Sequence, residues 1–467
     1  MRTKIILLLL SFTLLLSSLP GCAMLPTSTP TPSLPPEPTH TPTDQQTTLP
    51  ATLSLYPEPP AWARGAVIYQ LFIRAFTLEG TFKAATARLP ELREMGVDII
   101  QLLPIHPTGT EKRIGSLGSP YSIRDYRAID PALGSEDDFR QFIETAHTLG
   151  MYVIMDFVAN HTAWDNPLLT EHPDWYTQNA AGEIVPPRPD WLDVADLNYT
   201  SDALRAYMLE TSLYWVNTFG IDGYRCDASD LVPNDFWTEW RTTLLATRPD
   251  LLLLSESDGL ALYRAGFEVA YDWGTRDKFI QALKNPKLAI AILPPIAREL
   301  TQTGVWRLRY LENHDHDRIA QVAATPAQRE LSAVFLLTLP GLPLIYNGQE
   351  VGLTQRPSLF DISKLNWRLG TDDLRTVYTT LIHLRRESPA LREGTLEILK
   401  LSIPSVVAYT RATATQRVLI LLNFAAQPAQ ITLPDLITGT DLLSREAVDL
   451  SAGIQLNGDD YRIIEIP

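Results

Sequence analysis

The chain has 467 residues, of which 45% are hydrophobic, enough for a large core and for more than one domain. It carries 39 lysines and arginines against 54 aspartates and glutamates, so its formal net charge is −15. Because nucleic acids and anionic membrane surfaces attract basic patches, this charge argues against either as the main partner. An acidic surface is compatible with a neutral substrate.

The N-terminus is typical of a targeting signal. Two of the first four residues are basic, and they precede an apolar run over residues 5–16 that is shorter than a membrane-spanning helix. The sequence Leu-Pro-Gly-Cys at residues 19–22 resembles the lipobox of bacterial lipoproteins. We therefore expect a signal peptide over residues 1–21 and a lipid-modified Cys22, with ordinary secretion after a nearby cleavage as the alternative. The mature protein is then expected outside the cytoplasm, anchored at the cell surface or at the periplasmic face of a membrane.

Residues 22–60 are dense in proline and threonine. Such a segment has too few apolar side chains to fold and favours an extended, polyproline-like conformation. It would act as a linker between the lipid and a folded domain, so contact with a membrane is expected only through the anchor. The remaining cysteine, Cys226, has no partner within the chain once Cys22 is modified, which excludes an intrachain disulfide in the mature form.

Residues 61–388 alternate short hydrophobic runs with amphipathic stretches typical of helices. Nearly continuous hydrophobicity indicates parallel strands that are covered on both faces. Eight such strands alternating with helices predict an α/β fold, a (β/α)8 TIM barrel. A doubly wound open sheet is the weaker alternative, because no glycine-rich phosphate loop is present. The eight runs cover residues 66–72, 98–104, 152–158, 223–227, 251–256, 267–273, 308–315 and 343–350.

Two regions differ from this pattern. Residues 162–200, after the third predicted strand, form an inserted subdomain that holds Trp164, Trp175 and Trp191. We expect these tryptophans either to line a binding site or to pack the insertion, with packing expected for two of the three. Residues 389–467 change to short alternating runs separated by turns, which predicts an antiparallel β-sandwich domain.

Charged and polar side chains follow four of the predicted strands. In a (β/α)8 barrel the active site lies at the carboxyl ends of the strands. Side chains alternate along a strand, so Arg225 and Asp227 share one face while Cys226 points to the other. A single buried pair of this kind is compatible with a structural ion pair, but four strands that bring such groups to one rim predict a catalytic site. The groups are Asp156, Asn160 and His161; Arg225 and Asp227; Glu256; and Asn313, His314 and Asp315.

Clustered carboxylates without a Cys/His metal-ligand set or a phosphate loop indicate glycosidic bond chemistry. That reaction needs one carboxylic acid to protonate the leaving oxygen and a second carboxylate to face the anomeric carbon. Arg225 is expected to hold Asp227 ionised by lowering its pKa, which suits a nucleophile. Glu256 follows a run of four leucines and faces other acids, so burial and like charge are expected to raise its pKa, as a general acid requires.

Seven short motifs occur along the chain, each weak alone. They are GVDIIQLLP (96–104), DFVANHT (156–162), VADLN (194–198), GYRCDAS (223–229), SES (255–257), LENHDHDR (311–318) and GLPLIYNGQE (341–350). Their sequences and their order resemble those of the α-amylase family of glycoside hydrolases, glycoside hydrolase family 13. The resemblance covers the whole predicted barrel and the C-terminal domain.

The resemblance implies a role for each of three acids. Asp227 corresponds to the nucleophile that forms a covalent glycosyl-enzyme, Glu256 to the general acid/base and Asp315 to the carboxylate that stabilises the transition state. The implied reaction is hydrolysis of α-glucosidic bonds with retention. For that outcome the carboxyl groups of Asp227 and Glu256 are expected about 5–5.5 Å apart.

The same resemblance implies residues that bind the substrate. Tyr121, in the sequence GSPYSIRDY, corresponds to an aromatic ring that stacks under the sugar at the cleaved bond. Asp156 is expected to support the site rather than to act in catalysis. The side chains expected to contact that sugar or the nucleophile are His161, Arg225, Asn313 and His314.

A structural calcium ion is the cofactor that the resemblance implies, since many members bind one. Asn160 and Asp196 correspond to side chains that bind this ion, with a backbone carbonyl near Leu231 completing the site. Oxygen ligands of this kind suit Ca²⁺. Because some members lack the ion, its presence here is left open.

The expected substrate is an α-glucan, and the expected activity is cleavage of α-1,4 bonds in starch or maltodextrins. Many α-amylases carry a Lys-His pair three and four residues after the nucleophile, where this chain has Asp230 and Leu231, and a tryptophan two residues after the acid, where it has Asp258. These departures lie on the leaving-group side of the cleft and leave the product pattern open. Neopullulanase or cyclomaltodextrinase, oligo-1,6-glucosidase and transglycosylase activities are therefore alternatives, and the oligomeric state is left open. A non-catalytic glycan-binding surface protein is a further alternative, but relatives of that kind lose the catalytic acids that this chain retains.

Overall fold

The computed structural model describes residues 56–433 and 436–467. The predicted signal peptide, Cys22 and residues 22–55 of the predicted linker lie outside the described residues. Within the described ranges, no helix is both long and apolar enough to cross a membrane.

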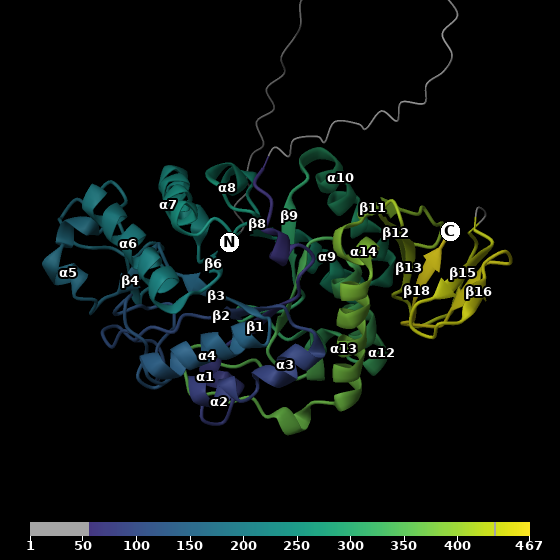
Figure 1. Cartoon of the computed structure of the whole chain (residues 1–467), viewed down its shortest axis with the longest axis horizontal. Coiled ribbons are helices and arrows are strands. Elements are labelled where there is room, and N and C mark those ends of the chain that lie inside the picture. The colour runs from purple at the N-terminus through teal and green to yellow at the C-terminus, as the bar shows by residue number, and fades with distance from the viewer. Residues whose placement is uncertain (1–55, 434–435) are drawn as a thin grey trace, which may run out of the picture. The chain divides into compact units, whose positions relative to one another are not determined.

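Eight parallel strands close into a barrel, which confirms the predicted fold (Figure 1). Around the ring they stand in the order β1, β2, β3, β6, β7, β8, β9 and β10, and β10 pairs again with β1. The chain therefore runs round the barrel in sequence order, as successive β-α units require. The strands are β1 (Ile68–Leu71), β2 (Ile99–Leu102), β3 (Tyr152–Phe157), β6 (Gly223–Cys226), β7 (Leu252–Ser255), β8 (Val269–Tyr271), β9 (Trp306–Arg309) and β10 (Leu342–Tyr346).

One predicted strand is displaced. Residues 308–315 were expected to be extended, but β9 ends at Arg309. The carboxylate of Glu312 accepts hydrogen bonds from Nη1 of Arg318 and from the backbone amide of Ile319, both at 2.6 Å. This buried contact turns the chain, so the polar residues that follow lie on a loop beyond the strand rather than at its last position.

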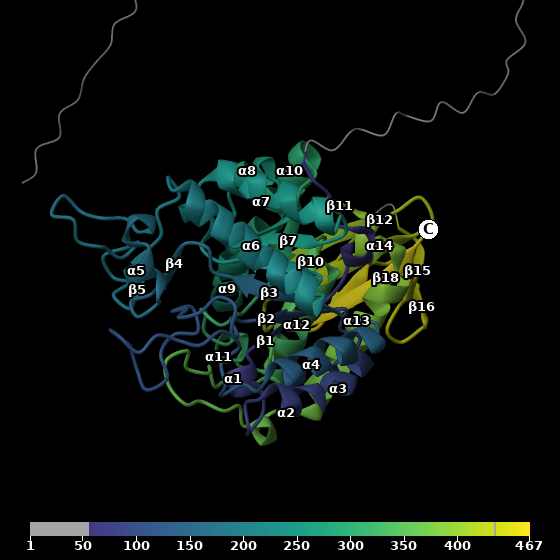
Figure 2. The same ribbon diagram turned by 60° about the vertical axis from the view of Figure 1, so that its left-hand side comes forward.

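Helices cover the outside of the barrel (Figures 1 and 2). Their starts follow the local sequence: Ser135 and Asp138 form a reciprocal capping box at the start of α4, and Thr325 caps α12, whose first residue is a proline. The helices of the barrel and its C-terminal junction are α1 (Ile73–Phe76), α2 (Phe82–Thr86), α3 (Leu89–Met95), α4 (Glu136–Thr148), α6 (Asp202–Phe219), α7 (Asn234–Thr247), α8 (Leu260–Ala265), α9 (Trp273–Lys284), α10 (Leu293–Thr303), α11 (Ile319–Val322), α12 (Pro326–Thr338), α13 (Asp372–Glu387) and α14 (Pro389–Glu393).

The interior of the barrel changes from apolar to polar along the strands. Residues two apart on a strand share a face, so a side chain that points into the barrel has its next inward neighbour two residues further along the strand. On three neighbouring strands the first of these belongs to a buried apolar cluster and the second is a buried polar group at the carboxyl end. Local alternation therefore places the polar groups at one rim. The pairs are Ile68 and Gln70, Ile99 and Gln101, and Ile154 and Asp156.

The insertion after β3 contains a small antiparallel ribbon. Strands β4 (His161–Ala163) and β5 (Val194–Asp196) pair with His161 opposite Asp196, and α5 (Leu168–Glu171) lies between them in sequence. Trp175 is buried here and stacks on the ring of His172 with centroids 4.0 Å apart. It packs the insertion, one of the two outcomes expected for these tryptophans.

The C-terminal residues form an antiparallel sheet domain. Alternate residues of β12 face opposite sides: Val406 and Ala408 join the apolar cluster between the two sheets of this domain, whereas Val407 and Tyr409 join the core that continues under the barrel helices. The six-stranded sheet has the order β11-β12-β13-β18-β15-β16, and β14 pairs with β17. The strands are β11 (Thr395–Ile398), β12 (Val406–Ala412), β13 (Arg417–Asn423), β14 (Ala429–Ile431), β15 (Thr438–Asp441), β16 (Ala447–Asp449), β17 (Ile454–Leu456) and β18 (Tyr461–Ile466).

Candidate active site

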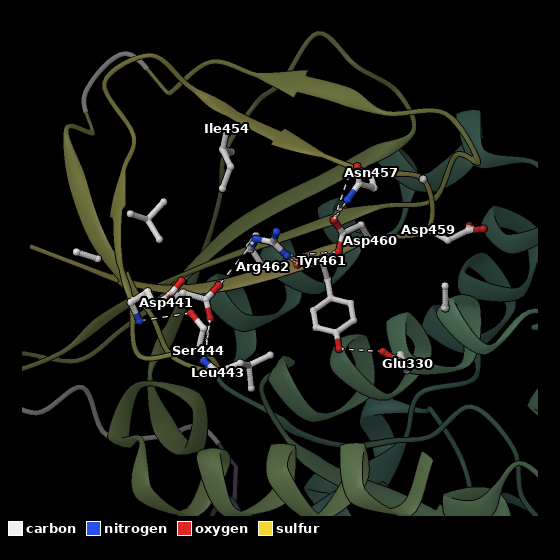
Figure 3. Close-up of a pocket in the computed structure, with 15 residues that line it drawn as sticks. Glu330, Asp441, Leu443, Ser444, Ile454, Asn457, Asp459, Asp460, Tyr461 and Arg462 are labelled. Atoms are coloured by element: carbon white, nitrogen blue, oxygen red, sulfur yellow. Dashed lines mark hydrogen bonds and ion pairs between the residues drawn. The ribbon is translucent and has the colours of Figure 1, made fainter. Parts of the chain in front are cut away.

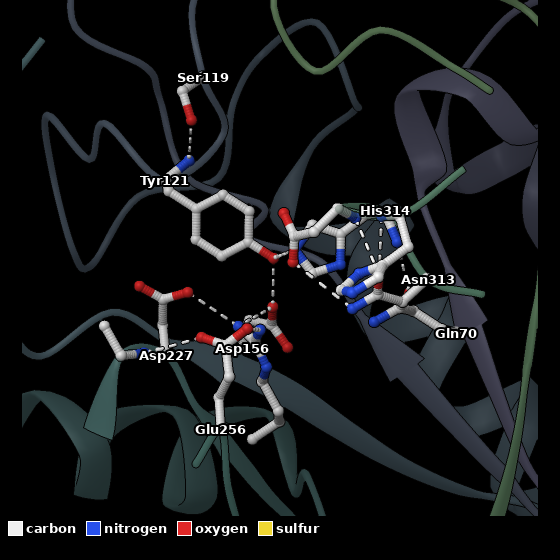
Figure 4. Close-up of polar contacts among 12 residues, drawn as sticks. Gln70, Ser119, Tyr121, Asp156, Asp227, Glu256, Asn313 and His314 are labelled. Carbon is white, nitrogen blue, oxygen red and sulfur yellow. Dashed lines mark hydrogen bonds and ion pairs between the residues drawn. The ribbon is translucent and has the colours of Figure 1, made fainter. Parts of the chain in front are cut away.

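Arg225 contacts three carboxylates at the polar rim, Asp156, Asp227 and Glu256, which Figure 4 labels. Its guanidinium is fully buried and donates from Nη1 to Oδ2 of Asp156 and to Oδ1 of Asp227, both at 2.9 Å. Its Nη2 contacts Oε1 of Glu256. One cation is therefore shared by three carboxylates that come from β3, β6 and β7. The structure brings together the predicted nucleophile and the predicted general acid on a single guanidinium.

The pKa of Asp227 differs from the expectation. Arg225 lowers it, as expected, but burial outweighs Arg225 and raises the pKa of Asp227 to about 6. Asp156 and Asp315 raise it further, because their negative charges disfavour another carboxylate beside them. The expectation of a lowered pKa was therefore wrong in sign, although the effect of Arg225 was correct.

Glu256 follows the expectation. Burial raises its pKa to about 8, with further contributions from Asp227 and Asp315, while Arg225 and the backbone amide of Ala228 oppose the shift. The two acids interact, so their titrations belong to the pair. Near neutral pH the pair favours an ionised Asp227 and a protonated Glu256, which is the combination that a nucleophile and a general acid require.

Ala228 is a backbone contributor that the sequence pattern did not reveal. It adopts a left-handed conformation with φ of 41°, uncommon for a residue other than glycine. In this conformation its amide donates to Oε2 of Glu256 at 2.9 Å. Only the position directly after Asp227 could have suggested it, because alanine carries no chemical signal of its own.

Tyr121 and His314 form one side of the site. The hydroxyl of Tyr121 donates to Oδ2 of Asp156 at 2.7 Å and lies 2.7 Å from Nε2 of His314. The two rings are stacked, with centroids 5.2 Å apart. Burial lowers the pKa of His314 to about 4 and raises that of Asp156 to about 6. Asp156 thus binds both Tyr121 and Arg225, and its supporting role stays a prediction.

Asp315 approaches from the loop after β9. Oδ1 of Asn313 accepts the amide of Asp315 at 3.0 Å and that of His316 at 3.1 Å, which fixes this turn. The Asp315 side chain is 43% exposed and lies 3.1 Å from Nε2 of His314. Asn313 therefore orients the third acid, and its predicted contact with substrate stays a prediction.

These groups surround a cavity of about 320 Å³. Of the side chains predicted to contact the substrate, Tyr121, His161 and His314 line it, while Arg225 lies beneath it. Burial lowers the pKa of His161 to about 4, so it is a neutral hydrogen-bonding group at neutral pH. The lining residues are Ser119, Tyr121, His161, Trp191, Asp193, Val194, Asp227, Ala228, Glu256, His314, Asp315, Leu359 and Phe360.

Comparison with known proteins decides the family. Residues 43–186 and 188–380 match the α-amylase catalytic domain, and residues 396–463 match the C-terminal domain of maltogenic amylase. The chain belongs to the α-amylase family.

Relatives in this family carry several names. An α-amylase of Haloarcula japonica is 32% identical over 83% of this chain and 59% of its own length, so the chain spans less than two thirds of that relative. A cyclomaltodextrinase of a Bacillus species is 26% identical over 78% of this chain and 74% of its own length. Neopullulanase 2 of Thermoactinomyces vulgaris is 24% identical over 80% and 72%, respectively.

Two solved structures of α-amylase family members superpose on this chain. An α-amylase of Lactobacillus plantarum has a TM-score of 0.80 at 31% identity, over 87% of this chain and 100% of that one. A maltogenic α-amylase of Thermotoga neapolitana, described as noncanonic, has a TM-score of 0.79 at 30% identity, over 86% and 98%. Both support the barrel with its C-terminal sheet as one structural unit.

Trp191 is the tryptophan of the insertion that reaches the cavity of this α-amylase family chain. Its ring lies edge-on to His161, with centroids 5.6 Å apart. Trp164 instead donates its Nε1 to the carbonyl of Leu192 at 3.0 Å. Together with the buried Trp175, this leaves Trp191 as the member of the three that lines the site.

A larger hollow of about 760 Å³ lies between α12 and the C-terminal sheet (Figure 3). None of the predicted site residues lines it. Its polar groups bind one another: Oη of Tyr461 donates to Glu330 at 3.2 Å, and Nη1 of Arg462 lies 3.4 Å from Oδ1 of Asp460. The hollow therefore offers no cluster of unpaired groups comparable to the carboxylates of the barrel.

The predicted calcium ligands are oxygen atoms, as Ca²⁺ prefers, but there are few of them. Asp196 is the one carboxylate among them, its pKa is raised by burial, and within the described residues no ion pair reaches it. Asn160 is buried directly before β4, while Leu231 lies on the turn after β6. Calcium takes six to eight oxygens, so water and backbone carbonyls would have to supply the remainder. No group of three or more His, Cys, Asp or Glu suited to a metal occurs in the described part of the chain.

Proposed function

We propose that this protein is a retaining glycoside hydrolase that cleaves α-1,4-glucosidic bonds of starch-derived chains and maltodextrins. The observation that carries the proposal is the shared contact of Asp227 and Glu256 with one guanidinium, beside the same cavity and with unequal pKa values. Two carboxyl groups in different protonation states on either side of one bond are what double displacement requires.

The first step uses both acids at once. The ionised carboxylate of Asp227 attacks the anomeric carbon, and protonated Glu256 gives its proton to the glycosidic oxygen as that bond breaks. The leaving chain departs as an alcohol, and the sugar remains attached to Asp227 through an ester bond. Arg225 stabilises the Asp227 carboxylate before the attack, at 2.9 Å from its oxygen.

The second step reverses these roles. Glu256, now ionised, accepts a proton from water, and the resulting hydroxide oxygen bonds to the anomeric carbon while the ester to Asp227 breaks. Asp315, exposed at the cavity, is placed to hold sugar hydroxyls, and the neutral imidazoles of His161 and His314 offer further hydrogen bonds. Two inversions at one carbon give overall retention.

A second candidate of the same chemistry is a cyclomaltodextrinase or neopullulanase. It is supported by the match of residues 396–463 to the maltogenic amylase C-terminal domain and by relatives with those names. Asp230 and Asp258, which are exposed near the two catalytic acids, replace residues common in α-amylases. Oligo-1,6-glucosidase activity is a third candidate, and transglycosylase activity is a further outcome that the following experiment separates.

The experiment incubates the full-length protein in detergent with maltoheptaose and, separately, with pullulan. Products are resolved by length and anomer during the first minutes. We expect α-anomeric maltodextrins shorter than the substrate. Panose or isopanose from pullulan would move the assignment to a neopullulanase, and products longer than maltoheptaose would indicate a transglycosylase. Binding of maltoheptaose without any product would support the non-catalytic alternative.

The location of the protein is part of the proposal. The lipobox-like sequence ending at Cys22 and the proline- and threonine-rich residues 22–60 support an enzyme held outside the cytoplasm by a lipid and an extended linker. Such a position suits an α-glucan substrate too large to enter the cell. The membrane contact would run only through the anchor.

A further inference from the structure

Two loops interlock at one end of the catalytic cavity. We call residues 115–119, after β2, and residues 358–361, after β10, the end wall. The amide of Leu117 donates to the carbonyl of Phe360 at 2.8 Å. The amide and hydroxyl of Ser116 both donate to Oδ1 of Asp361, at 2.8 and 2.9 Å.

The end wall is held by backbone contacts as well as by side chains. Gly115 has φ of +71°, and a Cβ added there would lie 2.6 Å from the carbonyl oxygen of Phe360, so the two chains touch. Nη1 of Arg74, in α1, donates to the carbonyl of Gly118 at 3.0 Å and reaches that of Leu359 at 3.5 Å. The two loops are therefore packed directly against each other.

The end wall faces the cavity directly. Ser119, Leu359 and Phe360 line it together with Asp227 and Glu256. The cavity has a volume of about 320 Å³, at the small end of the range for ligand pockets, roughly 300–1,000 Å³. A space of this size accommodates a short segment of substrate.

The barrel order places the end wall opposite the general acid. In the closed ring, β1 is four strands from β7 in either direction. Glu256 follows β7 directly, whereas the end wall is built from the loops after the two neighbours of β1 and is held by Arg74, which follows β1. Figure 4 agrees, since Ser119 and Glu256 lie on opposite sides of the Tyr121 ring.

The chemistry of the bond then sets the direction of the chain. Glu256 protonates the oxygen on the anomeric carbon, so the leaving chain lies on the Glu256 side of the cavity. The 4-hydroxyl lies across the sugar ring from the anomeric carbon and points toward the end wall. Any sugar added at this hydroxyl extends toward Leu359 and Phe360.

We infer that the cavity accepts the non-reducing ends of α-glucan chains and that the enzyme removes short units from those ends. The end wall is the element that selects chain ends over internal bonds. This inference rests on the proposed function, and it adds the substrate class: chains with a free non-reducing terminus. An enzyme that bound internal segments would need the wall to be absent.

The test compares two chromogenic maltoheptaosides with the full-length protein. One carries a free non-reducing end, and the other carries a 4,6-O-ethylidene cap on that end. We expect the free compound to be cleaved at least about tenfold faster, a difference of about 1.4 kcal/mol in transition-state binding. Equal rates with cuts in the middle of the chain would overturn the inference and leave the proposed function intact.

If neither compound is cleaved, binding of the free and capped maltoheptaosides to the Asp227→Asn variant tests the inference separately from the proposed function. With neither compound cleaved, the proposed function fails. The inference still requires the capped chain to bind this variant about tenfold more weakly than the free chain. Equal affinities would overturn it.

Two variants test the end wall itself. Asp361→Ala removes the acceptor of Ser116, and Phe360→Ala removes a side chain that lines the cavity. We expect each to raise the ratio of capped to free cleavage by about threefold or more, a change of roughly 0.65 kcal/mol. Asp449→Ala is the matched control, because Oδ1 of Asp449 also accepts an amide and a hydroxyl, both from Ser451, in the distant C-terminal domain. An unchanged ratio in both wall variants would contradict the inference.

Discussion

Nη1 of Arg225 lies 2.9 Å from Oδ1 of Asp227, and the two side chains share a face because they are two residues apart at the end of β6. A fully buried arginine is costly unless it is paired. Here one guanidinium contacts three carboxyl groups, because Asp156 and Glu256 bind it as well as Asp227. The excess of negative charge favours a proton on the group with the higher pKa, which is Glu256. The pair is therefore part of the proposed chemistry rather than an isolated structural ion pair.

Replacement of the nucleophile is expected to abolish turnover. Asp227→Asn keeps the shape of the side chain but cannot form the ester, so kcat should fall on the order of 10⁴-fold or more. Binding of maltoheptaose, measured by calorimetry, should change little, because the proposed sugar-binding side chains of Asp315, His161 and Tyr121 remain. Asp222→Asn is a suitable control. Asp222 is a buried acid that accepts the amide of Val153 at 2.8 Å, and it does not line the cavity. Retained activity in Asp227→Asn would show that another group is the nucleophile.

The pH profile of kcat/KM is expected to be bell-shaped. Activity needs Asp227 ionised, so it should fall as the pH drops below about 6, and it needs Glu256 protonated, so it should fall as the pH rises above about 8. The optimum is then expected between these values. The two limbs report the coupled pair rather than each residue alone.

Glu256→Gln assigns the alkaline limb. An α-maltosyl fluoride substrate needs no acid to release its leaving group, so the variant should retain the first step on it. We expect its rate for that step to stay level above pH 8, where the unmodified enzyme with a glucan substrate declines. A persistent alkaline decline in the variant would assign that limb to a different group.

The same substitution is expected to stabilise the folded protein at alkaline pH. The folded-state pKa of Glu256 is raised above its unfolded value, so ionisation in the fold costs stability that grows as the pH rises from the unfolded pKa toward about 8. Glu256→Gln removes this cost and one of three carboxylates around Arg225. We expect a gain of about 1 kcal/mol at pH 8, or a melting temperature higher by roughly 1–3 °C, and a smaller gain at pH 5.5. Thermal unfolding at both pH values measures the difference, and a gain that shrinks with rising pH would contradict it.

Calcium is expected to raise the melting temperature through Asp196. A ligand that binds only the folded state stabilises it in proportion to the logarithm of its concentration above Kd. We expect the melting temperature to fall on addition of a chelator and to recover with Ca²⁺ but not with Mg²⁺, which prefers stricter octahedral sites. Asp196→Ala should lose this response. A chelator without effect on the unmodified chain would show that the predicted ligands hold no calcium.

Cys22 is expected to determine the location of the protein. Expressed in a bacterium that processes lipoproteins, the unmodified chain should incorporate labelled palmitate and sediment with membranes. Cys22→Ala should incorporate none, and Cys226→Ala should behave as the unmodified chain because Cys226 is buried in the barrel core. Soluble release of the unmodified chain would favour the alternative of ordinary secretion.

The strands and the position of the site could be predicted because both depend on local patterns. Continuous hydrophobic runs marked seven of the eight barrel strands within a few residues, and polar groups after Ile154 and Leu254 marked the rim. The seventh strand was misplaced, because Glu312 pairs with Arg318 and the turn they form has no signature in hydrophobicity. The contact of Ala228 with Glu256 was missed for the same kind of reason, since a backbone amide has no side-chain signal.

Residue pattern alone predicted a (β/α)8 barrel with four acids at its rim, since side-chain alternation and burial act within a few residues of the chain. The protonation of those acids depended on tertiary structure. Arg225 lowers the pKa of Asp227, yet burial and two neighbouring carboxylates from other strands reverse the sign. The closed end of the cavity depended on it as well: Ser116 and Asp361 meet across 245 residues of sequence, and a hydrogen bond between such distant loops leaves no trace in either segment. Which acid carries the proton, and which end of a sugar chain can enter, are set by long-range contacts that only the folded barrel brings together.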